Sequence, residues 1–182
     1  MHRSTRIDSL IAATALALAL NGCATVRPHS YLGRGIDFGD YRTYAWGPVG
    51  ALSTGDPRLD NNQIFIGLVE AAVDRQLAAK GFEKTKRPAA QLLIHLHARL
   101  DQRLESNSID REYRRRDGAE YRPFVYEAGT LLLDLIDTRT NGLAWRGWAE
   151  GSLDGVIDNQ DSMEASIDDA VAKILARLPV ED

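Results

Sequence analysis

The chain has 182 residues, a mildly acidic composition with a formal net charge of −4, and a single cysteine. One cysteine excludes an internal disulfide and a metal cluster held by cysteines. The acidic excess argues against a protein that binds nucleic acid or anionic lipid through its overall electrostatic field. The length suits one domain with a short N-terminal extension.

Residues 1–22 have the layout of a signal peptide. Arg3 and Arg6 precede an apolar run, residues 10–20, that is rich in alanine and leucine. This run is 11 residues long, whereas a helix needs about 20 to cross a bilayer. We therefore expect the segment to be removed rather than to remain in a membrane.

Cys23 directly follows residues 20–22, an aliphatic residue and a small pair, and this stretch resembles the lipobox of bacterial lipoproteins. The resemblance implies cleavage before Cys23, a diacylglycerol on its sulfur, and often a further acyl group such as palmitate on its amino group. Several acyl chains, each worth about 0.8 kcal/mol per buried methylene, would anchor the protein stably. Residues 24 and 25 are not aspartate, and resemblance to the enterobacterial sorting pattern then implies the outer membrane of a Gram-negative bacterium, facing the periplasm. The alternative is an ordinary secretory signal that ends in a chance cysteine.

Residues 1–22 hold two of the 22 basic and one of the 26 acidic residues, so their removal leaves 160 residues with a net charge of −5. Residues 23–36 contain Pro28, Gly33 and Gly35 without periodicity, and we expect them to form the lipidated cysteine and a tether. Residues 37–179 are then expected to form a single domain.

The first half of this domain predicts a strand, a helix and a strand. Residues 43–46 alternate aromatic with smaller side chains, as a strand does. From Asn62 to Lys80 apolar residues recur at helical spacing, with Asp60, Asn61 or Asn62 as possible caps and Gly81 at the end. Residues 92–99 alternate strictly between apolar and polar side chains, which predicts a strand with one buried face.

The second half predicts two more strands and a helix. Residues 131–137 and 143–152 would pair through a three-residue loop, 140–142, with Gly142 left-handed in a bulge. That loop places Leu133 and Leu135 on the face of Trp145, whereas a loop of two or four residues would mix charges into the leucine face. Residues 163–178 predict a helix capped by Asp161 or Ser162 and ended by Pro179. The fold class is therefore α+β, a four-stranded mostly antiparallel sheet with both helices packed on one face.

Residues 101–122, from Asp101 to Arg122, show no clear element and include an arginine-rich run, residues 111–116. This run could form a basic patch for an acidic polymer, or a solvated loop in which six basic and six acidic residues cancel. We favour the loop, and its role stays open.

Several landmarks, in this order and spacing, resemble the bacterial envelope lipoproteins grouped as domain of unknown function 4136. They are Asp37-Phe38 with residues 41–46, Lys80-Gly81-Phe82, residues 127–137, and Asn141-Gly142 with Trp145-Arg146-Gly147. The resemblance covers about residues 37–178. It implies no established activity and no catalytic residues, and the arginine-rich run matches nothing in it.

One sheet face collects the candidate binding residues, which are polar or aromatic: His95, His97, Arg99, Asp134, Arg146, Trp148 and Glu150. Two histidines two apart on a strand could hold zinc or copper if Asp134 lay beside them, but we favour strand residues paired with neighbouring charges. Trp148 could mark a recognition surface or cover a leucine edge.

The sequence carries no Gly-x-Ser-x-Gly elbow and no phosphate-binding loop, and Cys23 would be acylated. We therefore expect a non-enzymatic lipoprotein without cofactor or resident metal, held to the membrane by its lipid and binding an envelope protein or glycan. The alternative is a lipoprotein that binds a small ligand or metal at His95 and His97.

Overall fold

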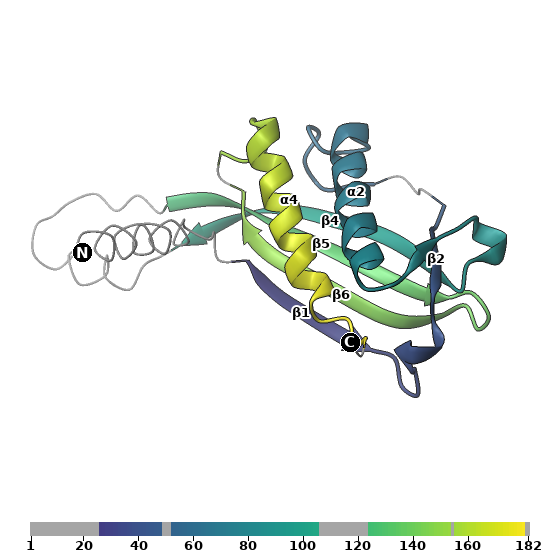
Figure 1. Ribbon diagram of the computed structural model, residues 1–182. Helices are drawn as coiled ribbons and strands as arrows, with labels where there is room; N and C mark the ends of the chain where they lie inside the picture. The colour runs from purple at the N-terminus through teal and green to yellow at the C-terminus, as the bar shows by residue number, and fades with distance from the viewer. Residues whose placement is uncertain (1–25, 49–51, 106–123, 154, 181–182) are drawn as a thin grey trace, which may run out of the picture.

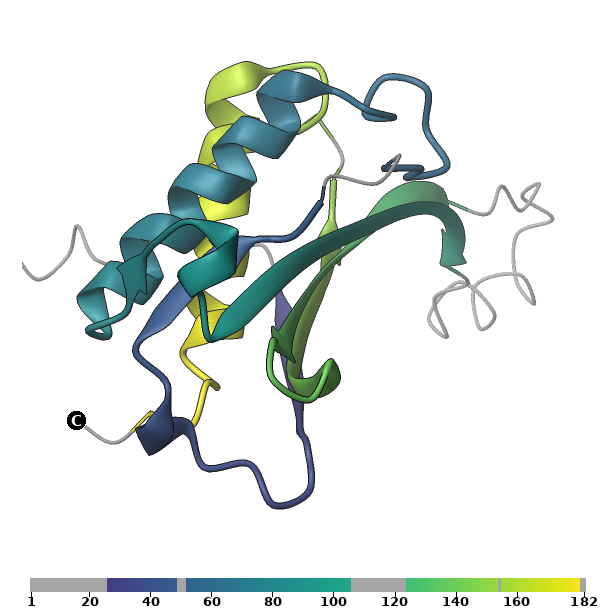
Figure 2. The same ribbon diagram turned by 90° about the vertical axis from the view of Figure 1, so that its right-hand side faces the viewer.

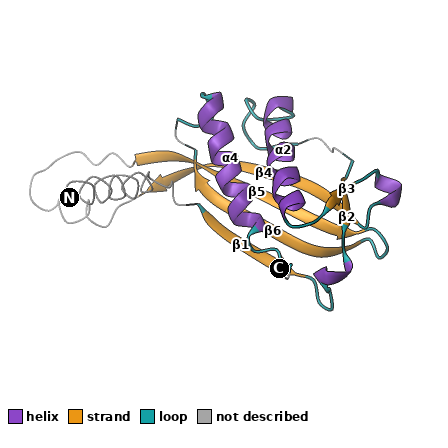
Figure 3. Ribbon diagram, in the orientation of Figure 1, coloured by secondary structure: helices purple, strands orange, loops and turns teal. Residues whose placement is uncertain are grey.

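A six-stranded mixed sheet and two α-helices, both on one of its faces, make up the described part of the chain (Figures 1 and 3). The structure is a computed structural model and describes residues 26–48, 52–105, 124–153 and 155–180. Its helices are α2 (Gln63–Ala79) and α4 (Gln160–Leu175), with the short 3₁₀ helices η1 (Phe38–Asp40) and η2 (Arg87–Ala89). Its strands are β1 (Arg27–Leu32), β2 (Thr43–Trp46), β3 (Glu83–Lys84), β4 (Leu92–Glu105), β5 (Phe124–Asp137) and β6 (Gly142–Ser152).

The sheet order is β1-β6-β5-β4-β2-β3, so the α+β class is confirmed but the sheet has two strands more than the expected four. The pairs β1–β6, β6–β5 and β5–β4 are antiparallel, whereas β2 runs parallel to both β4 and β3. The two added strands lie at the sheet edges. Edge strands need no alternating apolar pattern, because only one side of each is paired and little of their surface is buried.

Strand β1 occupies residues that the sequence assigned to the tether. Five of its six residues are exposed, and Pro28 interrupts any strand pattern. It nevertheless pairs with β6 from Arg27 opposite Glu150 to Leu32 opposite Trp145. Residues 27–32 of the expected tether therefore form a strand of the sheet rather than a free linker.

The two helices agree closely with the sequence prediction. Asn62 caps α2 by accepting hydrogen bonds from the N–H groups of Ile64 and Phe65, and Gly81 follows the helix at φ 83°. Helix α4 begins and ends three residues earlier than expected, so it stops at Leu175 and Pro179 does not end it. Its cap is Asn159, which accepts from the N–H of Ser162, rather than Asp161 or Ser162.

Both helices cross the same side of the sheet, and the described residues leave the opposite side uncovered (Figure 2). The helices run in the same direction: Phe65 and Met163, near their starts, line one cavity, while Lys80 and Val180, beyond their ends, line another hollow. The inner face of the sheet contributes Leu92, Ile94, Leu133, Leu135 and Trp145, all 1% exposed or less. This face and the helices form the core.

Gly147 makes room for the largest core side chain. A methyl group at Gly147 would lie 2.0 Å from Cη2 of Trp145 and 2.6 Å from Cγ2 of Ile174 on α4. The indole ring of Trp145 therefore folds over Gly147, two residues along β6 and on the same face. This contact explains why the Trp-Arg-Gly landmark has glycine at its third position.

The β5–β6 hairpin reaches the expected register by an unexpected route. Asp137 pairs with Gly142, which leaves a loop of four residues, and the left-handed residue is Asn141 at φ 53° instead of Gly142. The predicted three-residue loop is therefore wrong. A bulge between Leu135 and Ile136 restores the alternation, so that Leu135 lies opposite Trp145 on the buried face as expected.

Two buried tyrosines tie the start of the domain to distant elements. The Tyr44 hydroxyl and the Trp46 indole N–H donate to Oδ1 of Asp74 on α2, at 2.9 and 3.1 Å. The Tyr41 hydroxyl donates to Oδ2 of Asp137 at 2.9 Å. Burial and these carboxylates raise the pKa of both tyrosines. The aromatic landmark of residues 41–46 is therefore structural.

Candidate functional site

The candidate site is the sheet face opposite the helices, which we call the outer face. It comprises all seven residues predicted for it, together with His29 and Tyr31 of β1. Strand register arranges these side chains in three rows across four strands: Arg27, Glu150, Thr130 and Arg99; His29, Trp148, Leu132 and His97; Tyr31, Arg146, Asp134 and His95.

Asp134 and Arg146 form the polar centre of the outer face. The Arg146 guanidinium donates from Nε and Nη2 to the two carboxylate oxygens at 2.6 and 2.7 Å. The Asp134 side chain is 8% exposed and that of Arg146 is 42% exposed, so the carboxylate lies beneath its partner. The hydrogen bonds to Asp134 raise the pKa of Arg146 despite partial burial. This pair is a fixed, bidentate feature of the surface.

The two histidines of β4 do not assemble a metal site with Asp134. His97 Nε2 lies 3.5 Å from Oδ2 of Asp134, whose oxygens are already bound by Arg146. The His95 ring instead packs on Gly47, where a methyl group would lie 2.7 Å from two ring atoms. Within the described ranges, no group of three or more His, Cys, Asp or Glu side chains is arranged to hold a metal ion.

Trp148 stacks on a residue that sequence reasoning did not select. Its ring centroid lies 5.3 Å from that of His29, with the ring planes 19° apart. Tyr31, one row further along β1, is 51% exposed. His29 and Tyr31 were assigned to the tether, and nothing in that stretch indicates that it would pair with β6. The sequence therefore gave no signal for these two residues.

The remaining predicted residues, Arg99 and Glu150, lie in the row nearest the C-terminal end of β4. Arg99 Nε donates to Oδ1 of Asp101, two residues further along β4, at 3.0 Å. Glu150 lies between Arg27 and Thr130 in the register of β1, β6 and β5. In this row one acidic side chain and one neutral side chain, Glu150 and Thr130, lie between the basic side chains of Arg27 and Arg99.

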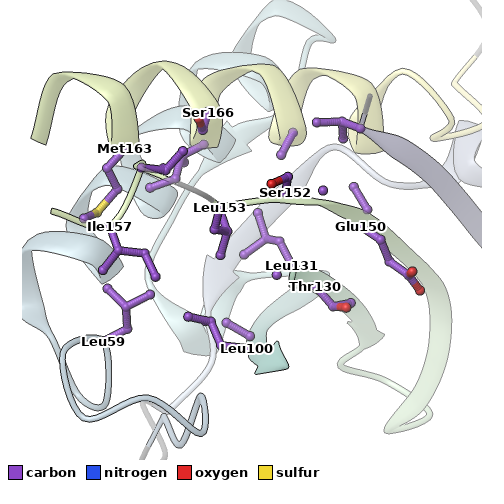
Figure 4. Close-up of a pocket in the computed structure, with 18 of the residues that line it drawn as sticks. Leu59, Leu100, Thr130, Leu131, Glu150, Ser152, Leu153, Ile157, Met163 and Ser166 are labelled. Carbon is purple, nitrogen blue, oxygen red and sulfur yellow. The ribbon is translucent and has the colours of Figure 1, made fainter. Parts of the chain in front are cut away.

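A second feature, not predicted from the sequence, is an apolar cavity between the sheet and the first half of α4 (Figure 4). Its volume is about 100 Å³. The lining is mainly aliphatic and comes from segments far apart in the chain, including Val26, Leu59, Leu131, Leu153, Ile157 and Met163. Ser166 stands at its margin; Thr130 and Glu150 also belong to the lining, but their side chains share the outer face of the sheet.

Some predicted features lie outside the described residues. They are the signal segment 1–22, the lipidation site Cys23, and the arginine-rich run 111–116. Across the described ranges, no helix combines the length and the apolar character that a bilayer crossing requires.

The landmarks used above agree with a family comparison. The model of the family DUF4136, described as a domain of unknown function, matches residues 30–180. The chain belongs to this family. The match begins within β1, so it includes the second half of the strand that the sequence assigned to the tether. None of the curated proteins compared with the chain matches it.

Solved structures resemble the fold at low sequence identity. A PDZ domain protein from Parabacteroides distasonis has a TM-score of 0.53 at 13% identity, covering 94% of this chain and 40% of that one. A DUF4136 family protein from Bacteroides thetaiotaomicron has a TM-score of 0.49 at 9% identity, covering 79% and 92%. PelC from Paraburkholderia phytofirmans, a dodecamer, has a TM-score of 0.48 at 14% identity, covering 87% and 100%. The chain thus spans two fifths of the first structure, and the likeness bears on the fold alone.

Proposed function

We propose that this DUF4136 protein is a non-enzymatic lipoprotein of the bacterial envelope, anchored through Cys23 to the outer membrane and facing the periplasm. Its outer face binds another envelope component, a protein or a glycan. The proposed location rests on the signal-peptide layout and the lipobox-like stretch of the sequence. Binding rests on the composition and order of the outer face.

The observation that carries the binding proposal is the row that joins His29, Trp148 and His97 across four strands. Stacking of His29 on Trp148 gives a rigid, flat aromatic surface beside the fixed Arg146–Asp134 pair. Tryptophan, tyrosine and arginine are the residues most enriched at energetically important interface positions. A surface that combines them in one place is suited to recognition.

Two ion pairs of the outer face favour recognition over acid-base chemistry by the groups that form them. Asp134 is bound by Arg146, and Arg99 by Asp101. A general acid or base needs a proton that it can exchange with a substrate at hydrogen-bond distance. Carboxylates held by guanidinium groups instead present a fixed pattern of charge, which supports the non-enzymatic proposal.

Crosslinking and pull-down from envelope fractions tests the binding surface. The native chain is compared with Trp148→Ala and with Ile64→Ala, a matched control that removes an apolar side chain 59% exposed on α2. We expect Trp148→Ala to lose the partners that the native chain and Ile64→Ala recover. Recovery of the same partners by all three chains would exclude the outer face from binding.

Fractionation tests the anchor independently of the partner. Cys23→Ser removes the sulfur that would carry the lipid, so we expect the protein to move from the membrane fraction to the soluble fraction. If the variant still sediments with membranes after a salt wash, the anchor is not the lipid on this residue.

A further inference from the structure

The apolar cavity lies at the end of the fold where the chain enters the sheet. Val26, the first described residue, lines this cavity together with side chains of β4, β5, β6 and α4. A methyl group at Gly151 would lie 3.3 Å from Cγ2 of Val26, so Val26 packs on the inner face of β6. The first described residue of the chain is therefore part of the cavity wall.

Cys23 is three residues before Val26. Three extended residues span at most about 10 Å, whereas an acyl chain reaches across half of a hydrocarbon core about 30 Å thick. An acyl chain on Cys23 is thus long enough to reach the cavity from any position that Cys23 can occupy.

The lining matches the chemistry of such a chain. Leu131, Ile157 and Met163 surround the space in Figure 4, and Met is the side chain that adapts most readily to an irregular apolar guest. Asp169 is a charged residue of the lining on α4, whereas Arg99 belongs to the lining from a strand position whose side chain shares the outer face. An apolar cavity with few polar groups at its margin is the usual form of a small-molecule site.

The volume limits how much of the chain can enter. An engineered apolar cavity of about 150 Å³ takes up benzene and excludes water, so a cavity of about 100 Å³ has room for a few methylene groups. The remaining methylenes and the other acyl chains would stay in the bilayer. The cavity would thereby hold this end of the domain close to the membrane.

We propose that one acyl chain of the lipid on Cys23 inserts part of its length into this cavity. The inference rests on the proposed lipidation of Cys23. It adds an orientation to that function: the cavity end of the domain meets the membrane.

Photocrosslinking of the full lipidated chain tests the inference. Cells are grown with a diazirine-bearing palmitate, and the purified protein is irradiated in dodecyl maltoside micelles, digested and analysed by mass spectrometry. We expect the acyl chain to crosslink to cavity residues such as Met163 and Ile157. A lipidated Cys23 whose crosslinks fall only on detergent or outside the cavity would overturn the inference alone. A Cys23 without lipid would overturn the proposed anchor as well.

Two further arms identify the occupant. Ala170→Leu narrows the cavity and should abolish the crosslinks, whereas Ala165→Leu, at an exposed position of α4, should retain them. In the second arm, the unlabelled lipidated chain is placed in phosphatidylethanolamine–phosphatidylglycerol vesicles that carry a diazirine phospholipid. Protection of the cavity from this phospholipid supports the inference. Labelling of the cavity would show that bilayer lipid fills it, which contradicts an occupant from the protein's own anchor.

Discussion

Arg146 of β6 covers Asp134 of β5 on the outer face and binds both of its carboxylate oxygens, at 2.6 and 2.7 Å. The Asp134 side chain is 8% exposed, so it depends on this partner for its hydrogen bonds. The pair joins the neighbouring strands β5 and β6 next to Trp148. Loss of the pair is therefore expected to affect stability as well as binding.

Arg146→Met should lower the free energy of unfolding by about 2 kcal/mol, because it leaves a buried carboxylate without its cationic partner. The double variant Arg146→Met/Asp134→Leu should recover most of this loss, since no orphaned charge remains. Denaturant unfolding of the two variants and the native chain measures both effects. Equal destabilisation of the single and double variants would show that the orphaned carboxylate is not the cause.

Gly147→Ala should destabilise the protein by about 1–3 kcal/mol, since the added methyl group collides with Trp145 and Ile174. Gly67→Ala on the exposed side of α2 is the matched control, where a methyl group meets nothing within 4 Å. That control should stabilise the chain by about 0.5–1 kcal/mol through helix propensity. Thermal or denaturant unfolding distinguishes the two. A neutral Gly147→Ala would contradict the packing of Trp145 over this residue.

Asp74→Ala should cost about 1–3 kcal/mol, because the buried Tyr44 hydroxyl loses its acceptor together with the Trp46 indole. Asp169→Ala removes only an i,i+4 ion pair with Lys173 and should change stability by about 0.5 kcal/mol or less. The free energy of unfolding of both variants is measured by tryptophan fluorescence during denaturant unfolding. Similar stability of the two would remove Asp74 as the link between α2 and β2.

Asp137 should make the protein sensitive to acid. Burial alone would raise the pKa of its carboxyl. Hydrogen bonds from Tyr41 and from the N–H groups of Arg139 and Thr140 have the larger combined effect and hold the pKa below its ordinary value of 3.8. The folded state therefore binds this proton less tightly than the unfolded state. The stability that results is present above about pH 4 and is lost as the pH falls through the pKa of the folded state.

Unfolding measured between pH 6 and pH 2 tests this linkage. Asp137→Asn should flatten the decline in stability below about pH 4, and Tyr41→Phe should flatten it partly, because it removes one of the four hydrogen bonds that the carboxylate accepts. An unchanged slope in Asp137→Asn would show that other carboxyl groups cause the acid sensitivity.

Strong periodicity made most of the fold predictable. The helix 63–79, the strand 43–46 and residues 92–99 of β4 follow from repeated apolar spacing, because burial of one face leaves that pattern in the sequence. The strand β4 continues to Glu105, into the stretch 101–122 for which no element was predicted. The edge strand β1 leaves no such pattern, because it is mostly exposed. The β5–β6 hairpin shows a related limit: the face of each side chain was correct, but a bulge and a longer loop produced it.

The candidate site was predictable only in part for the same reason. The seven residues of β4, β5 and β6 share the outer face as alternation requires. His29 depends on β1, and the apolar cavity depends on Leu59, Leu153 and Ile157, which belong to connecting segments without a pattern. Sites assembled from such segments depend on tertiary packing, which cannot be predicted from the apolar periodicity of single elements.

Mass spectrometry of the mature N-terminus tests the central claim most directly. The protein is purified from membranes of its bacterial host and digested, and its first peptide is sequenced. We predict a peptide that begins at Cys23 and carries a diacylglycerol on the sulfur. An unmodified thiol at Cys23, or a mature chain that begins at another residue, would contradict a lipid-anchored envelope protein.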